Sequence, residues 1–221
     1  MTVKLVIFDV DDVLYDATLQ KRNARENAVR AMIDAGLPVD YEVFLDKLRE
    51  VIEEKGEDYG KHFDETLMRL GLKVDPRIIT AGVVAYHDTK RAYLKPFPNA
   101  FKGILLLREK GYRVGVCTAG QSIKDWEKII RLGMHHLFHY AWVGQACEET
   151  FKKIPKEVGI ESSAAVFITA NPILANEAKK AGWRVIRIRR GKWAMKEAER
   201  PDVEVQSIWE VEKAIENLSK E

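Results

Sequence analysis

The sequence contains only two cysteines, Cys117 and Cys147, in 221 residues. This is not the dense cysteine pattern of a small disulfide-stabilised extracellular domain, and two reduced thiols in a cytoplasmic protein are the simpler interpretation. The sequence also lacks an apolar run long enough to span a bilayer. Its first apolar run is short and is broken by Asp9, so we expect no signal peptide. These absences predict a cytoplasmic protein with no membrane partner.

The sequence has almost no net charge. Lys and Arg total 36 and Asp and Glu total 34, which gives a formal net charge of +2. No overall basic field therefore favours nucleic acid as a partner. The basic stretch 184–193 is better explained by a strand with alternate solvated residues and a charged loop after it. The sequence leaves the oligomeric state open.

Apolar residues make up 46% of the chain, enough for a sizeable core, and many of them fall in short runs separated by helical patterns. Runs of this kind alternating with helices predict a parallel sheet with helices on both faces. We therefore expect an α/β protein with a Rossmann-like three-layer core. The predicted strands are Leu5–Phe8, Val114–Cys117, Tyr140–Val143, Ala165–Ile168, Arg184–Ile188 and Val203–Val205.

Residues 16–94 break this alternation, because they contain no convincing strand pattern. Apolar residues at helical spacing in this segment, such as Phe44, Leu48 and Val51, predict amphipathic helices. We expect helices at 21–35, around 44–52, at 58–70 and at 76–93. The chain would then consist of a core, residues 1–15 and 95–221, with an all-helical domain, residues 16–94, inserted after the first strand.

Three carboxylates, Asp9, Asp11 and Asp12, follow the first predicted strand. Open parallel sheets bind ligands beyond the carboxyl ends of their strands. Asp9 and Asp11 can project to the same side, and two such oxygen ligands suit Mg²⁺ and a substrate phosphate. One carboxylate could then attack phosphorus while the other carries a proton. The alternative, which we favour for Asp12, is that an acid here only caps a turn.

The stretch Asp9-Val10-Asp11-Asp12-Val13-Leu14 resembles the first motif of the haloacid dehalogenase superfamily, Asp-x-Asp-x-(Thr/Val)-Leu. The resemblance implies that Asp9 is the nucleophile and a metal ligand. It implies that Asp11 is the acid/base and that its backbone carbonyl is a second metal ligand. Mg²⁺ is the implied cofactor and a small phosphorylated molecule the implied substrate. The second Asp resembles the phosphatase branch, and the helical insert resembles the type-1 cap of this superfamily.

The second motif of the superfamily is a strand that ends in Ser or Thr. Thr118 occupies this place after Val114–Cys117. Its hydroxyl and the backbone N–H groups that follow, beginning with Ala119, can hold a transferring phosphoryl group. The helix after this loop is expected to begin with a capping box formed by Ser122 and Asp125.

The third and fourth motifs depart from the family pattern. Gln145 stands where the motif lysine is expected, six residues before Phe151, and Lys152 and Lys153 read as surface residues. Thr169 and Leu174 stand where two carboxylates are expected. The sequence thus supports a weakened Mg²⁺-dependent phosphatase that acts through an aspartyl-phosphate. The alternative is a catalytically inactive relative that binds a phosphorylated ligand or a protein partner.

Overall fold

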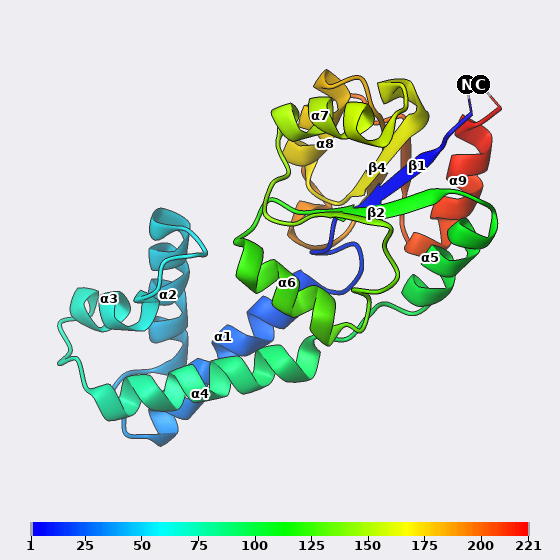
Figure 1. Cartoon of the computed structure of the whole chain (residues 1–221). Helices are drawn as coiled ribbons and strands as arrows, with labels where there is room; N and C mark the ends of the chain where they lie inside the picture. Colours follow the sequence, from blue (N-terminus) through cyan, green and yellow to red (C-terminus); the bar gives the residue numbers. More distant parts are fainter. Residues whose placement is uncertain (1, 221) are drawn as a thin grey trace. The chain divides into compact units, whose positions relative to one another are not determined.

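The computed structural model describes residues 2–220, and the chain divides into two compact units (Figure 1). The first unit contains the described residues up to Thr18 and those from Leu94 onward. The second unit is Leu19–Tyr93. Among the described residues, no helix is both long enough and apolar enough to cross a bilayer.

The first unit is built on one parallel sheet of six strands, in the order β3-β2-β1-β4-β5-β6. All six predicted strands are present, and their bounds differ from the predicted ones by no more than one residue. Buried Val, Ile and Phe side chains fill β1 and β4, as expected for strands covered on both faces. The strands are β1 (Leu5–Phe8), β2 (Arg113–Cys117), β3 (Tyr140–Trp142), β4 (Ala165–Thr169), β5 (Arg184–Ile188) and β6 (Val203–Val205).

Helices cover both faces of this sheet, which confirms the predicted α/β three-layer core (Figure 1). One apolar cluster joins one face to α5, α6 and α9. A second cluster joins the other face to α7 and α8. The bounds are α5 (Ala100–Glu109), α6 (Ser122–Arg131), α7 (Glu148–Val158), α8 (Pro172–Lys180) and α9 (Val211–Leu218), with short 3₁₀ turns η1 (Ser162–Ala164), η2 (Gly191–Trp193) and η3 (Ile208–Glu210).

The strand register places three polar residues along one edge of the sheet. Phe8, the last residue of β1, pairs with Val116 of β2 and with Ile168 of β4. Asp9, Thr118 and Thr169 therefore lie together at the carboxyl ends of three neighbouring strands. This edge is where an open parallel sheet binds its ligands.

The second unit contains only helices among its described residues, as predicted for this segment. Its helices are α1 (Ala17–Asp34, which begins in the first unit), α2 (Tyr41–Lys55), α3 (His62–Arg69) and α4 (Pro76–Tyr93). Apolar residues from the four helices form one buried cluster. Asp40 caps α2 by accepting hydrogen bonds from the backbone of Glu42 and Val43. The helix predicted at 58–70 is shorter than expected, because residues 57–61 form turns.

Candidate active site

Asp9 lies directly after β1 and is almost completely buried. Its Oδ1 accepts a hydrogen bond from the backbone N–H of Val10 at 2.8 Å. Its Oδ2 accepts one from the hydroxyl of Thr169, also at 2.8 Å. Burial raises the pKa of Asp9 to about 7; the Thr169 bond opposes this rise and the nearby Asp11 adds to it. The carboxylate is thus held in a fixed direction and changes charge near neutral pH.

Asp11 lies beside Asp9 but is more accessible. Its Oδ1 accepts hydrogen bonds from the hydroxyl of Tyr15 at 3.0 Å and from Nζ of Lys128 at 2.8 Å. Burial, followed by the charge of Asp11, raises the pKa of Tyr15 above its usual value, so this phenol remains a hydrogen-bond donor. Asp11 lies near enough to Asp9 for its charge to raise the pKa of Asp9, and the roles predicted for the two residues stay predictions.

Asp12 stabilises the local backbone by capping a turn, as the sequence indicated. It is buried and adopts a left-handed backbone conformation with φ of 59°. Its Oδ1 accepts from the backbone N–H of Thr18 at 2.9 Å, and its Oδ2 accepts from the Thr18 hydroxyl at 2.7 Å. The backbone of Gly191 packs so closely that a Cβ there would collide with the Asp12 carboxylate. Asp12 thus caps the start of α1 and fixes the loop after β5.

Thr118 is buried at the end of β2, with its hydroxyl oxygen and its carbonyl both engaged. Its Oγ1 accepts a hydrogen bond from the backbone N–H of Gly144 at 2.9 Å. Its carbonyl accepts from the backbone N–H groups of Gln145 and Ala146 at 2.7 and 2.8 Å. These bonds orient the Thr118 hydroxyl so that its own proton remains available for donation. Ala119, which follows it, is exposed at the start of the loop.

A lysine does reach this site, although the sequence analysis did not identify it. Nζ of Lys128 on α6 lies 2.8 Å from Asp11 Oδ1 and 2.8 Å from Asp125 Oδ1. The Lys128 side chain is 19% exposed and that of Asp125 only 4%. Burial by itself would lower the pKa of Lys128, but Asp11 and Asp125 outweigh it and raise this pKa above its usual value. The ammonium group is therefore charged at neutral pH.

The predicted capping box of Ser122 and Asp125 is wrong. Ser122 is the first residue inside α6, the residue before it is the N-cap, and no side chain caps the helix. Asp125 is instead buried against the loop at Gly120, where a Cβ would collide with its carboxylate. The physical reason is that the Asp125 carboxylate gains an ion pair with Lys128, an opposite charge that the backbone N–H of a capping box does not provide.

The sequence signal for Lys128 was its position three residues after Asp125 on the helix that follows Thr118. Residues three apart on a helix share a face. The family motif instead places its lysine six residues before Phe151, where this chain has Gln145. Lys152 and Lys153 are surface residues, as expected, since each pairs with an acid of its own helix α7.

The side chains at this site do not provide a complete set of ligands for a resident Mg²⁺. Thr169, a neutral residue, lies next to Asp9 where a third carboxylate was expected, and the buried Leu174 provides no oxygen. Among residues 2–220 there is no group of three His, Cys, Asp or Glu side chains placed to hold a metal ion. Because Mg²⁺ favours a nearly octahedral shell of hard oxygens, two carboxylates are a weak set. The predicted metal role of Asp9 and Asp11 stays a prediction.

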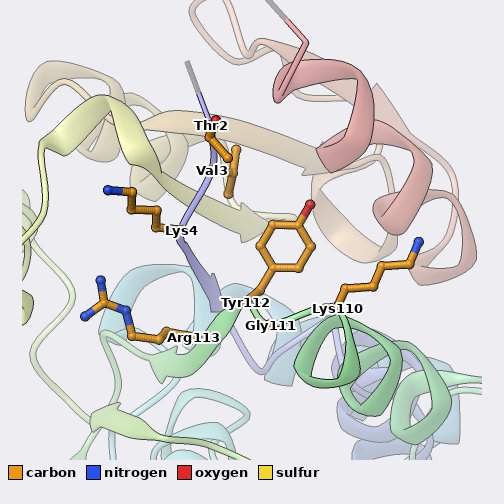
Figure 2. A pocket seen from close by; sticks show the side chains of 7 residues that line it. All are labelled: Thr2, Val3, Lys4, Lys110, Gly111, Tyr112 and Arg113. Carbon is orange, nitrogen blue, oxygen red and sulfur yellow. The ribbon is translucent and has the colours of Figure 1, made fainter.

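A surface hollow of about 430 Å³ lies at the other end of the sheet (Figure 2). It is formed around Lys4 and the turn before β2, at the amino ends of β1 and β2. Lys110 points away from Lys4 and Arg113 in Figure 2. Lys110 is paired with Glu212 and Glu216. We therefore assign the candidate active site to the carboxyl edge. The hollow is lined by Thr2, Val3, Lys4, Lys110, Gly111, Tyr112 and Arg113.

Comparisons with known proteins agree with this geometry. The family model of haloacid dehalogenase-like hydrolases matches residues 3–173. The glyceraldehyde 3-phosphate phosphatase of Methanopyrus kandleri is 38% identical over 99% of this chain and 100% of its own length. That of Methanocaldococcus jannaschii is 37% identical over the same shares. A haloacid dehalogenase-like hydrolase of known structure from Xanthomonas campestris is 19% identical, with a TM-score of 0.73 over 99% of this chain and 93% of its own. The chain belongs to the haloacid dehalogenase-like hydrolase family.

Proposed function

We propose that this chain is a phosphatase that hydrolyses a small phosphorylated metabolite through an aspartyl-phosphate. The observation that carries the proposal is the fixed pair of carboxylates at the end of β1, with Asp11 bound to the Lys128 ammonium. Family membership and two relatives named glyceraldehyde 3-phosphate phosphatase support it. We propose glyceraldehyde 3-phosphate as the first substrate to test.

In the proposed reaction, an oxygen of the ionised Asp9 attacks phosphorus and the bond from phosphorus to the ester oxygen breaks. The leaving alkoxide takes a proton from Asp11. Lys128 supports this transfer because its ammonium stabilises the carboxylate that Asp11 becomes. A water then attacks the aspartyl-phosphate and returns a proton to Asp11. Free phosphate leaves, and Asp9 is restored as a carboxylate.

Thr118 would bind the transferring phosphoryl group. Its oxygen already accepts from Gly144 N–H, so its hydroxyl proton can be donated to a phosphoryl oxygen. The backbone N–H of Ala119 is the other donor that we propose for this role. Such donors act most strongly when they are fixed before the reaction begins, and the hydrogen bonds around Thr118 fix it.

The family resemblance predicts Mg²⁺ as the cofactor for a reaction of this type, with Asp9 and Asp11 among its ligands. It would neutralise charge on the transferring phosphoryl group. Since these two residues are an incomplete set of ligands, the steps above are assigned to residues of the chain alone. We further propose that residues 16–94 act as the cap domain of this hydrolase and determine which substrate is accepted.

The proposal is tested by measuring phosphate release from glyceraldehyde 3-phosphate and from an aryl phosphate. Wild type, Asp9→Asn and the exposed control Glu109→Gln are compared, with and without Mg²⁺. We expect turnover by wild type and the control and none by Asp9→Asn. Mass spectrometry of acid-quenched wild type should detect a phosphoryl adduct on Asp9. Equal turnover by Asp9→Asn would overturn the nucleophile assignment.

The second candidate function is binding without catalysis. It is favoured by the neutral Thr169 and by Gln145, which occupy places where charged residues were expected. In that case the protein would bind a phosphorylated ligand at Thr118 and release no phosphate. Calorimetric binding of substrate to wild type, with no turnover under any metal condition, would favour this function over hydrolysis.

A further inference from the structure

We propose that the Lys128 ammonium supplies the positive charge at the Asp9–Asp11 pair, so that the chain works without a resident divalent cation. This inference rests on the proposed phosphatase function. It concerns only which group neutralises the negative charge of the site. The family resemblance gives this role to Mg²⁺. Three features of the site carry it: the oxygen atoms that are already engaged, the position of Lys128, and the way in which Asp125 holds that lysine.

The first feature is that the oxygens of Asp9 are directed at protein donors. The backbone of Val10 donates to Oδ1, and the hydroxyl of Thr169 donates to Oδ2. Thr169 is itself fixed, because its Oγ1 accepts from the backbone N–H of Asn171 at 3.0 Å. Each Asp9 oxygen keeps a second lone pair, so a cation at Oδ2 would share this oxygen with a hydroxyl that is itself held in place. Among residues 2–220, no third acidic side chain is grouped with Asp9 and Asp11 so that the three could hold a cation.

The second feature is that a cation already lies at Asp11. The ammonium of Lys128 is 2.8 Å from Asp11 Oδ1, in a largely buried position where charges are poorly screened. A divalent ion at the same carboxylate would be close to a like charge. The ammonium also carries three donors, of which the described residues engage two, at Asp11 and Asp125. The third is available to a phosphoryl oxygen.

The third feature is that a second carboxylate, that of Asp125, also binds the Lys128 ammonium. Asp125 is one helical turn before it on α6 and is buried, with its carboxylate against the Gly120 loop that follows Thr118. Two carboxylates bound to one ammonium group restrict a long, otherwise flexible side chain. The same helix therefore fixes the charge next to Asp11 and supports the phosphate-binding loop.

The experiment measures Mg²⁺ dependence by two readouts, turnover and binding, after removal of metal with a chelator. For wild type we expect aryl phosphate turnover to change no more than about twofold when millimolar Mg²⁺ is added. We also expect no calorimetric heat of Mg²⁺ binding and no shift of the thermal midpoint. Thr169→Asp, which restores a third carboxylate beside Asp9, should gain both a heat of binding and a stabilisation by Mg²⁺.

The outcomes separate this inference from the proposed function. Turnover that requires Mg²⁺ and is lost in Asp9→Asn would overturn the inference and leave the phosphatase intact. If wild type shows no turnover with or without Mg²⁺, the proposed function fails and the claim that the chain works without a cation fails with it. Saturable Mg²⁺ binding by wild type overturns the inference whether or not there is turnover. Lys128→Met should gain Mg²⁺ binding, because its two carboxylates have lost their cation, whereas the exposed control Lys156→Met should not.

Discussion

Replacing Asp9 by Asn should stabilise the first unit at about pH 8 and slightly destabilise it at about pH 4. Asp9 has a pKa of 3.8 when it is free and about 7 in the folded protein, chiefly because it is buried. Between these values the folded protein keeps a proton that the unfolded chain has released. The free energy of unfolding contributed by this group therefore falls as the pH rises from about 4 to about 7.

The size of the effect follows from the same two pKa values. A difference of about three pK units corresponds to about 4 kcal/mol, an upper value that applies in full above pH 7. Asn carries no charge and escapes this penalty. It can accept from Val10 or pair with Thr169, but it does not reproduce both bonds to the carboxylate, a loss of about 1 kcal/mol at every pH. We expect a net gain of about 3 kcal/mol at pH 8 and a loss of about 1 kcal/mol at pH 4.

The assay is urea unfolding followed by tryptophan fluorescence in the presence of a chelator. All five tryptophans lie between residues 94 and 221, so the signal reports on the first unit. Wild type, Asp9→Asn and the exposed control Glu109→Gln are compared across the pH range. The reasoning is refuted if Asp9→Asn differs from wild type by the same amount at both ends of that range. Groups common to both proteins cancel in this difference.

Three other predictions concern the same edge of the sheet. Without metal, kcat/KM should rise with pH through about 7, because only the ionised Asp9 attacks; a flat profile would contradict this. Lys128→Met should lower turnover roughly 10²–10³-fold while Lys156→Met leaves it unchanged, and equal loss in both variants would refute the role of Lys128. Asp12→Ala should lower the free energy of unfolding by about 1–2 kcal/mol, since Thr18 loses its cap; urea unfolding measures this, and an unchanged midpoint would count against the cap.

The six strands could be predicted because the information for them is local. The runs Leu5–Phe8 and Ala165–Ile168 are apolar throughout. This is the sequence pattern expected for a strand that is buried on both faces. The acidic cluster was equally visible, since Asp9 and Asp11 follow such a run directly. The sequence also indicated that Asp12 only caps a turn, which its bonds to Thr18 bear out, whereas the roles of Asp9 and Asp11 stay predictions.

Local patterns were misleading where a residue had a stronger partner elsewhere. Ser122 and Asp125 have the spacing of a capping box, but α6 begins one residue too early for Ser122 to be its cap. The carboxylate of Asp125 then lies inside the first turn, where it can bind Lys128. Side-chain competition of this kind depends on the helix boundary, which a sequence pattern places only to within a few residues.

What the sequence by itself determined is the parallel α/β sheet, the helical segment and the acids that end β1. Only the tertiary structure decided where the positive charge of the site comes from. Lys128 is 117 residues from Asp11, and the two meet because β2 pairs beside β1 and brings α6 to the same edge. The physical reason is that the apolar and polar pattern of each strand and helix is local in the sequence. An ion pair between distant residues depends instead on which strands are neighbours in the sheet.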